Sequence, residues 1–357
     1  MTSRRSPSLQ EFTTETETQE TADRLTLRLA TQSARLRLAQ SEVTTLRNQL
    51  AIKDRELSTL LALDGEQVHT HVLKPTTGHR NNEATAFLIA SDWHVEERVE
   101  SGAVNGLNSY DLKESRRRAG LFFTRGMRLI DVLSRDIAIP HVVLALLGDF
   151  ITNSIHEDAA ESNLLSPVDA TLLAAEYLAS GIQFLLDHTK RAGTQFFVPC
   201  HSGNHARTTR ERRISTEHGN SLERMMYVLL ARHFRQESRI KFDIAEGYHS
   251  YIDCYGKIIR LSHGHHISYG GGIGGITIPV EKAISKWQKS RHADFDVFGH
   301  FHQYKDGDHW MGNGSMIGWN PFAISIKAEF QPPKQALFLW DKKRGSKTIA
   351  APILFQE

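Results

Sequence analysis

The 357-residue sequence contains only two cysteines, Cys200 and Cys254, and this scarcity excludes a fold held together by disulfides. No apolar run approaches the roughly 18 residues that a membrane span requires. The polar, glutamate-bearing first 21 residues lack the apolar segment of a secretory signal. Charge is nearly balanced, with 43 Lys and Arg against 41 Asp and Glu, so no general nucleic-acid or membrane surface is indicated. These absences favour a cytoplasmic protein without membrane contact, whose binding chemistry is local.

The first 84 residues divide by composition into three stretches. Residues 1–21 are rich in Thr and Glu, and we expect them to be disordered. Residues 22–63 contain neither Pro nor Gly, and apolar residues recur there every seven positions, at Leu29, Leu36, Val43, Leu50 and Leu57. Such a stripe predicts a coiled-coil helix that forms a homo-oligomer, and the alternative is a long helix packed on its own domain. Residues 64–84 have the composition of a linker.

From residue 85 to residue 357, strand and helix patterns alternate. Strand patterns lie at 85–94, 141–150, 194–205 and 294–298, helix patterns at 115–136, 167–192, 219–236 and 280–291, and hairpin patterns at 248–266 and 336–355. The nearly unbroken apolar run of the second strand is typical of a sheet that is covered on both faces. The order of elements predicts one α/β domain with layered sheets over residues 85–357.

Five of these strands or hairpins end in polar side chains of the same few kinds. In chain order they are Asp92 and His94, Asp149, Asn204 and His205, His263, and His300 and His302. Loops at the carboxyl ends of strands in an open α/β sheet converge on one crevice, so we expect these groups to meet. Two aspartates, an amide oxygen and several imidazoles are too many ligands for one tetrahedral ion, and they suit a two-metal centre.

The ordered set D-x-H, GD, GNH, HG and GHxH, spread over residues 85–315, resembles the signature of the calcineurin-like metallophosphoesterases. The resemblance implies a four-layer α/β/β/α sandwich. It also implies one metal ion held by Asp92, His94 and His302, a second held by Asn204, His263 and His300, and a bridging Asp149. A metal-bridging hydroxide would attack phosphorus, and His205 would steady the phosphoryl oxygens or protonate the leaving oxygen. Manganese is the favoured metal, with iron and zinc as alternatives.

The sequence departs from this family pattern at two positions. Thr152 stands where many members have the second aspartate of GDxxD, and Ala206 stands where many have an acidic residue after GNH. The carboxylate that would orient His205 therefore comes from elsewhere in the chain or is missing. Glu157, Asp158 and Glu161 are the candidates.

An arginine-rich run, RTTRERR, directly follows Ala206. Guanidinium groups match phosphate oxygens in pairs, so we interpret Arg207 and Arg210 as substrate-binding, with a solvated basic loop as the alternative. We therefore predict a phosphodiesterase or nuclease that acts on nucleic acid or nucleotides. The alternatives are a phosphomonoesterase and a coiled-coil scaffold with a vestigial site. We do not expect His265 and His266, beside the presumed ligand, to coordinate metal.

Overall fold

The computed structural model describes Thr44 and residues 70–74, 82–155, 157–269, 275–325 and 327–356. The stretch expected to be disordered, the coiled-coil helix apart from Thr44, and most of the expected linker lie outside these residues. Residues His69–Glu357 form one unit, and the fold below is that of this unit. Among the helices that the structure describes, none has the length and apolar character to cross a bilayer.

The unit contains two six-stranded mixed sheets. The first sheet has the order β12-β11-β2-β3-β4-β5, in which β2 to β5 are parallel and β11 and β12 are antiparallel to their neighbours. The second has the order β1-β6-β7-β8-β10-β9. The strands of the first sheet are β2 (Glu83–Ala90), β3 (Ala138–Leu146), β4 (Gln195–Cys200), β5 (Ile240–Ile244), β11 (Lys334–Asp341) and β12 (Ser346–Leu354). Those of the second are β1 (His71–Leu73), β6 (Ser250–Cys254), β7 (Lys257–Leu261), β8 (Phe295–Phe298), β9 (Lys305–Asp306) and β10 (Trp310–Gly312).

Successive side chains of the central strands point to opposite faces of the first sheet, and both faces are buried. In β2, Ala86 and Leu88 belong to the core beneath the helices, whereas Phe87 and Ile89 belong to the core between the two sheets. Side chains point to opposite faces with a period of two, so a strand that is apolar at every position must be covered twice. The same division holds in β3, where Val142 and Leu144 face the helices and Val143 and Ala145 face the other sheet, which confirms the prediction that this strand is covered on both faces.

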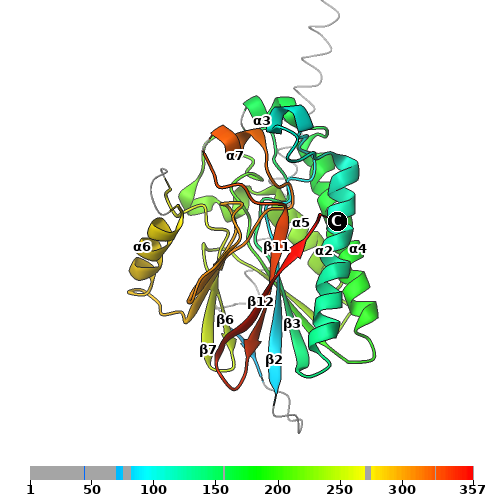
Figure 1. The fold of residues 1–357 in the computed structure, drawn as a ribbon, viewed down its shortest axis with the longest axis vertical. Helices are drawn as coiled ribbons and strands as arrows, with labels where there is room; N and C mark the ends of the chain where they lie inside the picture. Colours follow the sequence, from blue (N-terminus) through cyan, green and yellow to red (C-terminus); the bar gives the residue numbers. More distant parts are fainter. Residues whose placement is uncertain are drawn as a thin grey trace, which may run out of the picture. The chain divides into compact units, whose positions relative to one another are not determined.

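Helices form the two outer layers of the sandwich. The helices α2 (Leu112–Leu133), α4 (Pro167–His188) and α5 (Leu222–His233) cover the first sheet, and α6 (Thr277–Trp287) covers the second, so the layers run helix, sheet, sheet, helix (Figure 1). Local signals start these helices: the Asp111 side chain accepts from the Glu114 N–H at the start of α2, and Pro167 occupies the first turn of α4. Short elements in the loops are η1 (Ser101–Val104), α3 (Glu157–Ser162), η2 (Ile214–Thr216), η3 (His218–Asn220) and α7 (Pro321–Ser325).

One strand lies where a linker was expected. Residues 71–73 form β1, which pairs in parallel with β6, and the His71 ring stacks on Phe197 with their centroids 3.7 Å apart. A three-residue strand is too short to give a periodic signal in the sequence. The folded unit therefore includes residues upstream of the predicted start at residue 85.

Candidate metal centre

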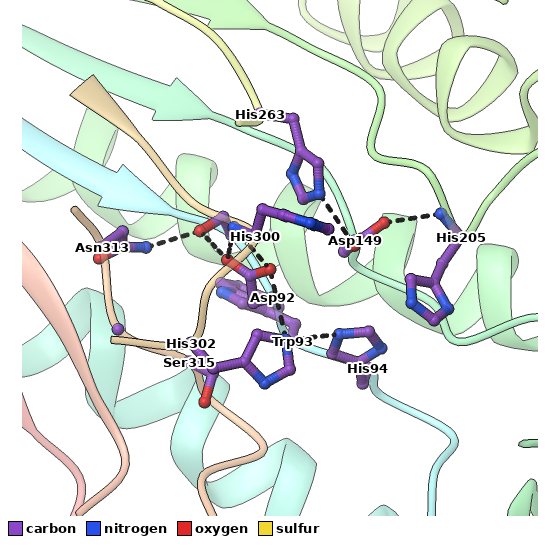
Figure 2. Close-up of polar contacts among 12 residues, drawn as sticks. Asp92, Trp93, His94, Asp149, His205, His263, His300, His302, Asn313 and Ser315 are labelled. Carbon is purple, nitrogen blue, oxygen red and sulfur yellow. Dashed lines mark hydrogen bonds and ion pairs between the residues drawn. The ribbon is translucent and has the colours of Figure 1, made fainter. Parts of the chain in front are cut away.

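The five polar strand ends meet at one edge of the two sheets (Figure 2). Backbone hydrogen bonds join their loops in pairs: Asp92 N donates to Gly148 O at 2.9 Å, and Gly299 N donates to His263 O at 2.9 Å. The loops pack so closely that a Cβ atom at Gly203 would lie 2.0 Å from an Asp149 carboxylate oxygen. Glycine is required there because any side chain would displace the aspartate.

The candidate ligands share an unusual backbone conformation. Among the described residues, nine non-glycine residues have a positive φ, and five of these nine are Asp92, His94, Asp149, His300 and His302. This left-handed region costs about 1 kcal/mol or more for an ordinary side chain, and it persists only where surrounding contacts enforce it. The conformation turns the chain sharply at each strand end. Its concentration at these positions indicates a functional site.

A first group of ligand atoms comes from Asp92, His94 and His302, which all lie within 4.8 Å of one another. The Nε2 atoms of His94 and His302 are 3.2 Å apart, and His302 Nε2 is 3.5 Å from Asp92 Oδ1. The Asp92 carboxylate is fully buried and accepts hydrogen bonds from the Ser91 hydroxyl and from His300 N. These contacts fix the carboxylate so that it faces the two imidazoles.

The orientation of His94 follows from its hydrogen bonds. Thr152 Oγ1 donates to Glu97 Oε2 at 3.0 Å, so it must accept from His94 Nδ1, which lies 3.0 Å away. His94 Nε2 then carries a lone pair aimed at His302. Burial lowers the pKa of His94 well below its ordinary value and that of His302 to about 4, so both rings are neutral. His302 Nε2 lies 3.2 Å from that lone pair, and with its own proton on Nδ1 it would present a second lone pair, so that both nitrogens could ligate one cation.

The second group comes from Asp149, His263 and His300. His263 Nε2 lies 2.9 Å from Asp149 Oδ2 and 3.2 Å from Asn204 Oδ1. Its other nitrogen, Nδ1, donates to the Leu147 carbonyl at 2.6 Å, which turns Nε2 toward the acidic side of the site. The side chain of Asn204 thus reaches the second group.

The ligand side chains of the centre shift one another's pKa values. Burial alone would lower the pKa of His263, but the Asp149 carboxylate outweighs it and raises this pKa to about 9. Burial opposes ionisation of Asp149, whereas His263 and the other imidazoles hold its pKa well below the ordinary range. Burial also raises the pKa of Asp92 to about 7. Divalent cations would replace these protons, and the Asp, Asn and His donors fit such ions.

His205 lies beside both groups. Its backbone N–H donates to Asp149 Oδ1 at 2.9 Å, and its ring meets the His94 ring edge to face with centroids 5.0 Å apart. Its Nδ1 donates to the Thr152 carbonyl at 3.0 Å. A backbone carbonyl therefore orients this ring at the position where the family pattern has an aspartate. Of the three carboxylates considered for that role, Glu161 is exposed, and the side chains of Glu157 and Asp158 lie outside the described residues.

The two arginines predicted to bind substrate differ in their surroundings. Arg207 is half-buried; it donates through Nη1 to the Asn204 carbonyl at 2.6 Å and through Nε and Nη2 to the Arg210 carbonyl at 3.4 and 3.3 Å. Its guanidinium braces the loop that carries Asn204. Arg210 is exposed. Both lie on the loop that leaves β4 next to the metal centre.

Sequence reasoning missed a buried carboxylate that joins two of the loops. Glu223 is fully buried, and its two oxygens accept from Phe150 N at 2.6 Å and from Gly203 N at 2.7 Å. These two amides flank Asp149 and Asn204 in the chain. Burial, with the nearby Asp149 charge, raises the pKa of Glu223 to about 8. A signal existed, since Glu223 shares the apolar face of its helix with buried residues three and four positions later.

A second unanticipated network holds Asp92. Asn313 Nδ2 donates to Ser91 Oγ at 2.8 Å, and Gln335 Oε1 accepts from Ser91 N at 3.0 Å (Figure 2 shows Asn313). The Ser91 hydroxyl, which accepts from Asn313, therefore gives its own proton to Asp92. Asn313 belongs to the GNGSM stretch after the last pair of histidines. Its contact explains why an amide stands at that position.

No known family profile matches the chain, and no curated protein matches it. Among solved structures, Vps29 from Entamoeba histolytica complexed with zinc is similar to it at 14% identity, over 49% of this chain and 89% of that one, with a TM-score of 0.25. Vps29 from Chaetomium thermophilum is 9% identical over 77% and 96% of the two chains, with a TM-score of 0.26. A protein described as a putative 5′-nucleotidase from Staphylococcus aureus, in complex with α-ketoglutarate, is 10% identical over 77% and 55%, with a TM-score of 0.29. At TM-scores this low, these likenesses carry no weight for the function of this chain.

Proposed function

We propose that the protein is a metal-dependent phosphoester hydrolase with two divalent cations in its active site. One observation carries the proposal: two groups of ligand atoms, each with one aspartate and two histidines, are brought together from separate strand ends. The groups are Asp92 with His94 and His302, and Asp149 with His263 and His300. Asn204 adds an amide oxygen to the second group. By the resemblance to the metallophosphoesterases, Asp149 would be the ligand shared by both cations.

When bound, the two cations supply positive charge for the phosphoryl oxygens and make a water molecule acidic enough to act as a nucleophile near neutral pH. The chain's own residues prepare the site for this. Ser91 and the His300 amide hold the Asp92 carboxylate in place, and Glu97 acts through Thr152 to fix the His94 ring. A site held this rigidly needs little reorganisation during the reaction.

His205 is the proposed proton donor to the leaving oxygen. Because its Nδ1–H is committed to the Thr152 carbonyl, Nε2 is the nitrogen that exchanges a proton with substrate. General acid catalysis of this kind contributes typically about 10²–10⁴-fold. We place His205 at the lower end, because a carbonyl supports an imidazolium less strongly than the expected carboxylate.

A phosphodiester of the nucleotide or nucleic-acid class is the favoured substrate, and manganese is the favoured metal. The support is the arginine-bearing loop next to Asn204, whose guanidinium groups suit phosphate oxygens. Arg210 is the candidate for direct substrate contact, while Arg207 contributes through the loop that it braces. Self-association through residues 22–63 and a cytoplasmic location stay predictions.

The test is turnover of bis-p-nitrophenyl phosphate, p-nitrophenyl phosphate and a dinucleotide by the Mn²⁺-loaded protein. We expect the two diesters to be hydrolysed faster than the monoester. His94→Ala should abolish turnover, whereas His141→Ala should not, because His141 lies on β3 and its ring contacts the Lys74 carbonyl instead of the metal centre. Faster monoester hydrolysis would make the protein a phosphatase, and no turnover of any ester by the loaded, folded protein would contradict the proposal.

A further inference from the structure

A third group of ligand-type side chains lies outside the two groups of the metal centre. It consists of Glu217, His265 and His266, whose potential ligand atoms lie within 4.8 Å of one another. Glu217 separates η2 from η3 in the segment between β4 and α5, and the two histidines follow β7. His265 Nε2 is 2.8 Å from Glu217 Oε1, and His266 Nε2 is 3.7 Å from Glu217 Oε2.

Five of the six side-chain polar atoms of this group are buried without a hydrogen bond to any described residue. The His265 side chain is 5% exposed, and neither of its ring nitrogens makes a hydrogen bond within the described residues. The same holds for both carboxylate oxygens of Glu217 and for His266 Nε2. The Tyr248 hydroxyl, which lies beside Glu217, gives its proton to the Ile214 carbonyl at 2.7 Å. Buried polar atoms in folded proteins nearly always have a hydrogen-bond partner or a metal ion. The described residues provide no hydrogen-bond partner for these atoms.

Although the sequence did not predict that His265 and His266 coordinate metal, we propose that they bind, together with Glu217, one further divalent transition-metal cation of the zinc class. Two imidazoles and one carboxylate form a known zinc ligand set that leaves a fourth position for water. Ligands about 2.1 Å from a tetrahedral ion lie roughly 3.4 Å from one another. The separations of 2.8 and 3.7 Å bracket that value, so shifts of about half an ångström suffice.

This site is separate from the two-cation centre although it adjoins it. The His265 ring centroid lies 5.3 Å from that of His263 and 6.2 Å from that of His300. The ion would tie the segment after β4 to the loop after β7. Arg212 already joins the same two segments, because its Nη1 donates to the His265 carbonyl at 3.0 Å. A cation there would hold the arginine-rich segment in place next to the metal centre.

The experiment counts zinc per chain after the protein is equilibrated with Zn²⁺ and freed of excess metal by gel filtration. Glu217→Gln should bind one zinc ion fewer than the native protein. The matched control is Glu211→Gln, an exposed change in the same segment, which should bind as many as the native protein. Equal zinc content in Glu217→Gln and the native protein would overturn the proposal. His266→Gln should also lose one ion, and it provides the test if Glu217→Gln does not fold.

A double variant separates this proposal from the proposed function. His94→Ala with His263→Ala removes one histidine from each group of the metal centre and leaves the third group intact. This protein should retain one zinc ion, and X-ray absorption should show two imidazoles and oxygen ligands around it. A double variant with no zinc would overturn the third site. Metal-independent hydrolysis would overturn the proposed function and leave the one-ion difference in Glu217→Gln unaffected.

Discussion

The buried Glu223 carboxylate joins the loops that carry Asp149 and Asn204, so its neutral amide counterpart should weaken both the fold and the metal centre. In Glu223→Gln, one oxygen remains to accept from either Phe150 N or Gly203 N. The other position becomes an NH₂ group facing an N–H donor at hydrogen-bond distance. One buried amide is therefore left without an acceptor, and two donors are brought together.

The size of the effect follows from these two hydrogen bonds. A hydrogen bond between neutral groups contributes about 0.5–1.5 kcal/mol, and an unsatisfied buried donor costs about 1–3 kcal/mol. Since the pKa of Glu223 is about 8, its carboxyl is mostly neutral near pH 7, and the main effect of Glu223→Gln is the buried donor that it leaves unsatisfied, so we expect the free energy of unfolding to fall by about 1–3 kcal/mol. Metal affinity should fall as well, because Asp149 and Asn204 lie on the loops that the carboxylate holds.

Urea unfolding of the metal-free protein measures the stability change, and titration with Mn²⁺ measures the affinity. Glu246→Gln is the matched control: Glu246 is 66% exposed and pairs with Arg224 at 3.3 Å, so its loss should change stability by less than about 1 kcal/mol. If Glu223→Gln is as stable as Glu246→Gln and binds Mn²⁺ as tightly as the native protein, Glu223 does not hold the two loops.

Three further predictions concern the site and the chain upstream of it. Gly203→Ala should lose metal, because the new Cβ would lie 2.0 Å from an Asp149 oxygen. Gly247→Ala is the control and should keep its metal, because a Cβ there meets nothing within 4 Å; metal analysis compares the two variants. His205→Ala should keep its metal, since its backbone N–H still reaches Asp149, but it should slow a dinucleotide about 10²-fold and bis-p-nitrophenyl phosphate less. Equal slowing of both substrates would assign His205 to charge stabilisation instead. A chain that begins at His69 should scatter light as a smaller species and still hydrolyse its substrate, and an unchanged mass would refute oligomerisation through the predicted coiled coil.

Much of the fold could be predicted from the sequence because its central strands carry strong local signals. The apolar run before Asp149 predicted a strand buried on both faces, and the packing of β3 confirms it. The short strand β1 could not be predicted, because three residues give no period. Its place is set by pairing with β6, a contact between segments far apart in the chain.

In the candidate site, too, the sequence indicated the ligand positions but not the contacts between residues that are far apart in the chain. Strand-end position was enough to bring Asp92, Asp149 and His263 to one edge, since parallel strands place their carboxyl ends together. The supporting contacts were not predictable, because each joins residues far apart in sequence. Glu223 on α5 reaches Phe150 in the loop after β3, and Asn313 after β10 reaches Ser91 after β2. Such partners depend on the packing of the finished fold.

Metal reconstitution tests the central claim most directly. The protein is stripped with EDTA, Mn²⁺ is added in measured equivalents, and bound metal and hydrolysis of bis-p-nitrophenyl phosphate are followed together. The Glu217→Gln protein is used so that the third site does not add to the count. We expect no turnover without metal, a rise that is complete when two ions are bound per chain, and no activity at any loading in His94→Ala. Turnover by the metal-free protein, or full activity in His94→Ala, would contradict the assignment of this site as a two-metal phosphoesterase centre.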